Sequence, residues 1–212
     1  MKAVLLALGA AALAAGCAGS PPPPDWQSNA HLALKSYETA DLTGNTRVAE
    51  AEFARGRAEL ASTGRPDLVA RAELLRCAIQ GASLAFDDCP GFKALAADSA
   101  PQERAYADYL AGRWQGLDAS ALPEQHRAVI GTGELPAEPL ARLVAAGALL
   151  RAGRITPAAI AAAVESSSAN GWRRPLLAWL GVQEKRAVSA GDNDAAAKIR
   201  RRIELVTTKG GR

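Results

Sequence analysis

Apolar and small residues recur three, four or seven positions apart along most of the chain. This spacing places them on one face of an α-helix, whereas the strict alternation typical of a β-strand is nearly absent. The pattern therefore predicts an all-α fold. The stripes are Trp26, Ala30, Ala33 and Tyr37; Ala49, Phe53, Gly56 and Leu60; Leu68, Ala72, Leu75 and Ile79; Tyr106, Tyr109 and Leu110; Leu140, Leu143, Val144 and Ala148; and Ala196, Ile199, Ile203 and Val206.

Capping and breaking residues divide these stripes into separate helices. Gly64, two residues before a proline, predicts the end of one helix and the start of the next. Ser99 and Gln102 have the spacing of a capping box, in which each side chain bonds to backbone at the other end of the first turn. Thr156 followed by Pro157 predicts a cap and a first helical residue.

Neighbouring helices pair into hairpins with a nearly regular period. The steps between successive hairpin starts are 38, 33, 39 and 34 residues. A period in the mid-thirties is typical of helix–turn–helix solenoids, and tetratricopeptide repeats use about 34 residues. The predicted hairpins start near Ser28, Pro66, Ser99, Glu138 and Trp172.

Within three of these hairpins a turn glycine is followed five residues later by an alanine, which would let the two helices approach closely. Phe53 adds an aromatic residue at the family's spacing in the first hairpin. On these residues the chain resembles a tetratricopeptide-like α-solenoid of four or five irregular hairpins over residues 28–206, followed by a disordered tail at 207–212. An irregular helical bundle is the alternative. The glycine–alanine pairs are Gly44 and Ala49, Gly153 and Ala158, and Gly191 and Ala196.

The first sixteen residues have the composition of a secretory signal peptide. Lys2 supplies one positive charge, an apolar run follows, and the small residues Ala15 and Gly16 precede Cys17. The apolar run is too short to be a stable membrane span. On these residues the N-terminus resembles the lipobox of bacterial lipoproteins. An ordinary soluble-secretion signal cut near Cys17 is the alternative.

The resemblance implies that Cys17 is lipidated through its sulfur after residues 1–16 are removed. Residues 17–27 would then form the lipidated N-terminus and a spacer, because four consecutive prolines make a semi-rigid segment. In that family an aspartate directly after the cysteine retains the protein in the inner membrane. Ala18 stands there instead, which implies the outer membrane, with the protein facing the periplasm.

Charge on the mature chain is nearly balanced. Removing Lys2 with the signal leaves 24 of the 25 Lys and Arg residues against 22 Asp and Glu, a net charge of about +2. This balance argues against a nucleic-acid partner, which requires a dedicated basic surface. Near the C-terminus, basic residues predict a solvated helix surface, with contact to an anionic surface as the alternative. They are Lys198, Arg200, Arg201, Arg202, Lys209 and Arg212.

Three cysteines become an even pair once Cys17 is assigned to the lipid. Cys77 and Cys89 then predict a disulfide, because an exported chain enters an oxidising compartment. A redox or metal site is the alternative, but no Cys-x-x-Cys motif occurs and the two histidines, His31 and His126, lie far apart in sequence. We expect no metal and no cofactor.

Catalytic signatures are missing from the sequence, including Gly-x-Ser-x-Gly and His-Glu-x-x-His. Glu165 and Ser166, with Gly181 and Gln183 further on, faintly resemble motifs of lytic transglycosylases, whose glutamate protonates the glycosidic oxygen. Only 46 residues follow Ser166, too few for a lysozyme-like domain. A surface position at a helix end is therefore the expected role of Glu165.

Two further features predict structure more than chemistry. Asp87 and Asp88 supply too few oxygens to hold a cation alone, and before Pro90 they predict an acidic turn. The tryptophans are expected in the core or between hairpins, although a concave groove could expose one or two. They are Trp26, Trp114, Trp172 and Trp179.

Taken together, these features predict a non-enzymatic, periplasm-facing lipoprotein that acts as a protein-binding adaptor or scaffold in the bacterial cell envelope. Solenoids present extended binding surfaces, and a lipid anchor fixes such a surface to the membrane. The expected partners are envelope proteins and the membrane, with no small-molecule substrate. The alternatives are an enzyme that acts on peptidoglycan through Glu165, and a structural lipoprotein that contacts peptidoglycan without hydrolysing it.

Overall fold

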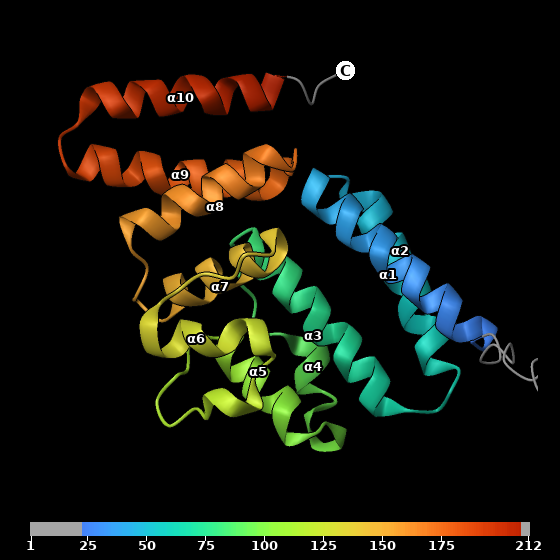
Figure 1. Cartoon of the computed structure of the whole chain (residues 1–212). Helices are drawn as coiled ribbons and strands as arrows, with labels where there is room; N and C mark the ends of the chain where they lie inside the picture. Colours follow the sequence, from blue (N-terminus) through green and yellow to red (C-terminus); the bar gives the residue numbers. More distant parts are fainter. Residues whose placement is uncertain (1–22, 209–212) are drawn as a thin grey trace, which may run out of the picture.

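The computed structural model describes residues 23–208 of the chain (Figure 1). This part contains ten α-helices, two 3₁₀ helices labelled η2 and η3, and no β-strand, which confirms the all-α prediction. In chain order the elements are α1 (Asp25–Thr43), α2 (Thr46–Ala61), α3 (Pro66–Ala82), α4 (Pro90–Lys93), η2 (Ala96–Asp98), α5 (Pro101–Leu110), η3 (Ala119–Ala121), α6 (Glu124–Thr132), α7 (Pro139–Arg151), α8 (Pro157–Ala169), α9 (Arg173–Ser189) and α10 (Asn193–Thr208).

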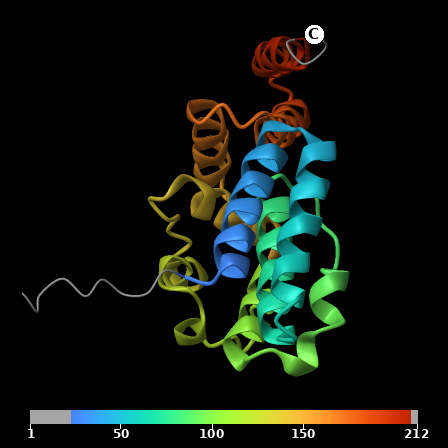
Figure 2. The ribbon, with the colours of Figure 1, turned by 90° about the vertical axis from the view of Figure 1, so that its right-hand side faces the viewer.

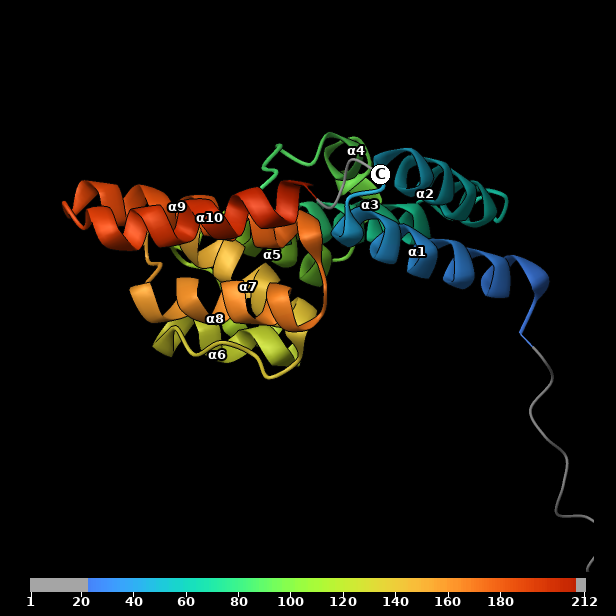
Figure 3. The same cartoon turned by 90° about the horizontal axis from the view of Figure 1, so that it is seen from above.

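Helices α3 and α7 form the centre of the molecule. Figure 1 shows α8, α9 and α10 stacked above α7, with α10 outermost, and α5 and α6 below it. The α1–α2 hairpin lies along the other side of α3, and in the view from above it extends away from the remaining helices (Figure 3). Figure 2, turned by a quarter, shows α10 again at one extremity. The main core joins residues of α3, α5, α6, α7, α8 and α9.

The crossing of α3 and α7 is unusually close because both helices carry a glycine there. A Cβ placed on Gly147 of α7 would lie 2.5 Å from the carbonyl oxygen of Gly81 on α3, so no larger residue fits without movement. Around this point α7 is buried on nearly all sides, with Leu143, Ala145 and Ala146 fully inaccessible to solvent. The small residues of α7 thus let four helices pack around it.

Trp179 of α9 closes the end of α3. Its ring is fully buried, and its indole N–H donates a hydrogen bond of 3.0 Å to the carbonyl oxygen of Ala82, the last residue of α3. A C-terminal carbonyl of a helix has no partner within its own helix, so this bond satisfies a group that burial would otherwise leave unpaired. The contact therefore attaches the α8–α10 stack to the central helix pair.

Arg174, also on α9, attaches the α1–α2 hairpin. Its Nε donates to the carbonyl oxygen of Asp41 at 2.7 Å, and its Nη2 donates to Thr46 Oγ1 at 2.8 Å, at the junction of α1 and α2. The Asp41 carboxylate is buried 3.7 Å from the same guanidinium. Burial raises the pKa of Asp41, and the charge of Arg174 opposes that shift.

The predicted glycine turns are present, and two of the three predicted alanine contacts accompany them. Gly44, Gly153 and Gly191 all have positive φ, a conformation that glycine adopts without the strain of a Cβ. Five residues later, Ala49 and Ala196 are buried, as expected. The prediction for Ala158 was wrong: it is exposed, and its neighbour Ala159 is buried instead, because α8 packs on α7 and α9 one residue out of the expected phase.

The solenoid arrangement is not confirmed. Antiparallel neighbours pack as α1–α2, α7–α8, α8–α9 and α9–α10, but α3 packs on α7, and α1 also contacts α9. In a solenoid each repeat contacts only the adjacent repeats, so neither the α3–α7 contact nor the α1–α9 contact fits a solenoid. The helix that starts at Pro66 lacks its expected hairpin partner because the chain after it forms a loop and the single turn α4.

Caps at two helix starts show how local chemistry sets the boundaries. At α8 the Thr156 hydroxyl accepts from the backbone N–H of Ala159 at 3.1 Å, which confirms the predicted cap. At α5 the predicted capping box was wrong by one residue. The Glu103 carboxylate accepts from the N–H of Ala100, while the Ser99 hydroxyl donates back to the carbonyl oxygen of Ala96 at 2.8 Å.

Both ends of the helical region extend further than predicted. Helix α1 begins at Asp25, inside the expected 17–27 spacer, because a proline precedes it and an acidic first residue favours the positive end of the helix dipole. Helix α10 continues to Thr208, since the hydroxyls of Thr207 and Thr208 bond to backbone carbonyls one turn earlier. The predicted signal peptide, Cys17 and residues 209–212 lie outside the described residues.

The geometry of the α3–α7 contact predicts opposite effects on stability for alanine substitutions at its two glycines. Gly147→Ala should lower the free energy of unfolding by about 1–3 kcal/mol, because the added methyl meets the Gly81 carbonyl. Gly81→Ala should leave it unchanged or raise it by up to about 1 kcal/mol, because space around Gly81 is open and alanine favours a helix. Urea unfolding measures both, and equal effects of the two variants would contradict this packing.

Candidate functional site

An open groove of about 620 Å³ lies between α3, α5 and the segment that runs from η3 into α6. Side chains from three stretches far apart in sequence line it. Helix α3 supplies Arg71, Leu74, Leu75 and Ala78; α5 supplies Gln102, Glu103 and Tyr106; and the third segment supplies Ser120, Ala121, Leu122, Pro123 and Arg127.

The floor of the groove is apolar and rests on the main core. Leu74 and Leu122 are only 4% and 2% exposed, and Ala78 is also buried. Leu75 and Tyr106 are partly exposed and complete the surface that an occupant would meet. Pockets that bind other molecules usually combine such an apolar floor with a few polar groups at the edge. The floor is rigid because core packing holds its buried members.

The polar groups of the groove lie at its rim. Arg71 Nε donates to Glu103 Oε1 at 2.5 Å, so the only carboxylate of the lining is already neutralised. Arg127 is exposed; its Nε donates to the carbonyl oxygen of Leu122 at 3.0 Å, and it forms no ion pair with any carboxylate in the described part of the chain. The groove therefore offers an apolar floor and one uncompensated guanidinium.

An aromatic cluster supports the groove from below. Tyr109 Oη and His126 Nδ1 share a hydrogen bond of 3.2 Å, and both side chains are buried. Tyr106, which reaches the groove, has its ring centre 5.7 Å from that of His126. Trp114 stacks on Tyr109 and donates its indole N–H to the Tyr109 carbonyl oxygen at 2.9 Å. Burial lowers the pKa of His126 to about 4, so the ring is neutral at pH 7.

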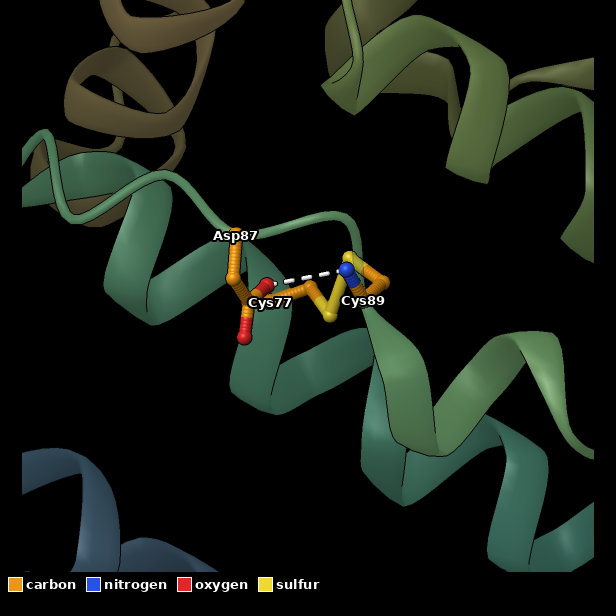
Figure 4. Close-up of side chains that lie close together, drawn as sticks. All are labelled: Cys77, Asp87 and Cys89. Carbon is orange, nitrogen blue, oxygen red and sulfur yellow. Dashed lines mark hydrogen bonds between the residues drawn. A yellow bond between two sulfur atoms is a disulfide. The ribbon is translucent and has the colours of Figure 1, made fainter.

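The structure confirms the predicted disulfide between Cys77 and Cys89. It joins α3 to the residue before α4, with a Cα–Cα distance of 5.8 Å (Figure 4). Asp87 Oδ1 accepts from the backbone N–H of Cys89 at 2.9 Å, which orients the turn that leads into the bridge. Asp87 is also the only carboxylate close to both sulfurs among the described residues. The cross-link fixes the loop that replaces a second long helix after α3.

Asp88, the other acidic residue of this turn, lies in a small charged surface instead of a cation site. Its carboxylate is 3.4 Å from Lys93 Nζ and 3.7 Å from Arg151 Nη2, and it is 72% exposed. Exposed ion pairs of this kind contribute little to stability, and the neighbouring cations compete with any bound metal ion. The acidic-turn interpretation fits this arrangement.

Glu165 lies on the exposed side of α8. It lines an open hollow together with Gln183 of α9 and Arg202 of α10, so the structure does bring together the two positions that resembled transglycosylase motifs. A glutamate that protonates a glycosidic oxygen works from a deep sugar-binding cleft, whereas Glu165 is exposed at an open hollow. Glu165 is the only acidic residue in the lining of this hollow.

Sequence reasoning did not identify the groove. Arg71, Tyr106 and Arg127 belong to no local motif, and they meet only because α3, α5 and α6 pack together. Leu75 and Tyr106 belong to the predicted apolar stripes, but the stripes alone do not show that both side chains stay partly exposed in a groove. Three tryptophans behave as predicted for packing residues: Trp179 is fully buried, and Trp114 and Trp172 pack against the core. Trp26 is partly buried outside both core clusters.

Comparison with known proteins adds no family to this description. No family model, no curated protein and no solved structure matches the chain. Within residues 23–208, every helix is too short or too polar to cross a bilayer. The case for a function therefore depends on the groove, the surface charges and the N-terminal sequence.

The buried histidine predicts a loss of stability at acidic pH. The pKa of His126 falls from 6.5 to about 4 on folding. As the pH drops below 6.5, the unfolded chain therefore binds a proton at this residue that the folded chain does not bind. Unfolding free energy should therefore decrease by about 2 kcal/mol between pH 7.5 and pH 5 from this residue. His126→Gln should remove that part of the decrease, measured by urea unfolding at both pH values.

The other histidine provides a matched control. His31 is exposed on α1, so His31→Gln should leave the pH dependence as it is in the wild type. If His31→Gln flattened the profile, or if His126→Gln left it unchanged, the buried neutral state of His126 would be refuted.

Proposed function

We propose that the chain is a non-enzymatic lipoprotein that binds another envelope protein through the groove between α3, α5 and α6. The observation that carries the proposal is the combination of a rigid apolar floor with the unpaired Arg127 at its rim. A groove of about 620 Å³ is large enough for several side chains of a peptide segment. The complementary ligand is a protein segment with apolar side chains and one acidic group.

The chemistry of the lining favours binding over catalysis. Glu103 is paired with Arg71 and also accepts from the backbone of Ala100, so it is not free to move a proton. The Ser120 hydroxyl donates to Asp118 at 2.8 Å and has no histidine beside it in the lining. Cores of protein interfaces use buried apolar and aromatic side chains with arginine, as this groove does.

The lipid anchor and the cellular address are part of the same proposal. Cleavage after residue 16, lipidation of Cys17 and a spacer up to the start of α1 would attach the protein to the outer membrane, facing the periplasm. Locally, the α1–α2 and α9–α10 hairpins support the resemblance to tetratricopeptide-like repeats, since each has a glycine turn followed by a buried alanine.

Filling the groove tests the proposal without disturbing the core. Gln102 is exposed on the first turn of α5, so Gln102→Trp should occupy the groove, leave the unfolding free energy nearly unchanged and weaken partner binding about tenfold or more. Arg127→Glu should act in the same direction through charge. The measurement is the yield of a stoichiometric envelope protein that co-purifies with the chain from solubilised envelopes.

Ala54→Trp is the matched control, because Ala54 is exposed on α2, away from the groove. It should keep the partner at the wild-type yield. An equal yield for all the variants would overturn the groove as the binding site, and so would the absence of any stoichiometric partner. If the wild-type chain released muropeptides from purified sacculi and Glu165→Gln abolished that release, the enzymatic alternative would replace the proposal.

A further inference from the structure

A loop between α3 and α4 covers the point where α3 crosses α7. We call residues 84–89 the lid; it runs from Leu84, just after α3, to Cys89, just before α4. A Cβ placed on Gly147 of α7 would lie 3.8 Å from Cε1 of Phe86 in the lid. The cavity between the lid, α3, α5 and α7 measures only about 10 Å³, about the smallest space that holds a water molecule. The lid is therefore closed over the helix crossing.

A covalent and a non-covalent attachment hold the lid to the helices. The first is the Cys77–Cys89 disulfide, which joins the end of the lid to α3 (Figure 4). The second is Arg151 of α7, whose Cζ lies 5.1 Å from the centre of the Phe86 ring and whose Nη1 donates to the carbonyl oxygen of Asp87 at 3.3 Å. The middle of the lid is exposed, so apolar packing contributes little to holding it.

The backbone is strained at both ends of the lid. Leu84 has a φ of 59° and Cys89 a φ of 48°, and they are the only non-glycine residues with positive φ in the part of the chain that the structure describes. Such conformations persist only where the surrounding structure enforces them. Cys89 also precedes Pro90, which favours an extended backbone at that position. The disulfide thus keeps Cys89 in a conformation that its own sequence disfavours.

We propose that the Cys77–Cys89 disulfide is a redox switch, which keeps the lid closed when oxidised and releases it when a dithiol reduces it. A thiolate of the dithiol attacks one sulfur and breaks the S–S bond, which gives a mixed disulfide and one cysteine thiol. The second thiol of the dithiol then displaces the other cysteine. Two electrons and two protons pass to the cysteines, and the dithiol becomes a disulfide. Both cysteine residues are partly exposed, which gives a dithiol access to the bond.

Contacts that hold the central helices together do not involve the lid. Gly147 lies against the Gly81 carbonyl, and the Trp179 indole bonds to Ala82 at the end of α3. Reduction should therefore open the lid locally and expose the side of the crossing that includes Val144 of α7, while the helices stay folded. The inference goes beyond the proposed function, because it requires neither the lipid anchor nor a partner in the groove.

Hydrogen exchange of the oxidised and reduced chains tests the proposal. Every described helix lies within residues 25–208, so the mature chain, residues 17–212 with Cys17→Ser, keeps the complete fold and contains only the two cysteines of the bridge. Dithiothreitol without denaturant should reduce the bond, which maleimide labelling of the thiols measures. The hydrogen-bonded amides of Ala85 and Lys93 should then exchange about tenfold faster or more, and those of α8 and α9 should change by less than about twofold.

The double variant Cys77→Ser, Cys89→Ser separates the effect of the bond from that of the reductant. Its lid should exchange fast both with and without dithiothreitol. In the chain that keeps both cysteines, reoxidation should restore slow exchange, and this comparison does not depend on the folding of the double variant.

Three outcomes would overturn the proposal. Resistance of the bond to dithiothreitol in the folded chain would show that a dithiol cannot operate the switch. Equal lid exchange in the oxidised and reduced chains would show that the remaining contacts, such as those of Arg151, hold the lid without the disulfide. Loss of protection throughout α8 and α9 on reduction would show that the disulfide supports the whole fold and does not control the lid alone.

Discussion

The close approach of α3 and α7 is the contact on which the rest of this structure depends. It brings the backbone of Gly147 against the Gly81 carbonyl, a distance that no side chain at residue 147 would permit. Because α3 meets α7 on one side, its other sides are available for the α1–α2 hairpin, the disulfide at Cys77 and the floor of the groove. Trp179 then joins the α8–α10 stack to the end of the same helix.

This arrangement supports the groove on which the proposed function rests. The groove needs rigid walls, and it has them because Leu74 and Leu122 are held by the core and the Tyr109–His126 pair lies beneath it. Figure 1 shows the start of α1, where the spacer from a lipid on Cys17 would arrive, at the edge of the molecule formed by the α1–α2 hairpin. We propose a tethered adaptor that binds its partner through this groove.

Much of the local structure could be predicted from the sequence, because it depends on a few adjacent residues. Stripe spacing, the Thr156 cap, the glycine turns and the Cys77–Cys89 pair all follow from local chemistry or simple pairing. The pairing of α3 with α7 could not be predicted, since hairpin reasoning joins only neighbours in the chain. The groove was missed for the same reason: Tyr106 and Arg127 acquire a role only when distant helices meet. Even the Ala158 error came from a one-residue phase difference that packing decides.

The most direct test of the central claim is site-specific photo-cross-linking in intact envelopes. A photoreactive residue at position 102, on the groove rim, should give one dominant cross-linked envelope protein, and Arg127→Glu in the same chain should remove that product. The same photoreactive residue at position 54, on the exposed side of α2, should not capture this protein. Identical products from positions 102 and 54, or no product from position 102, would contradict the assignment of the groove as the partner-binding site.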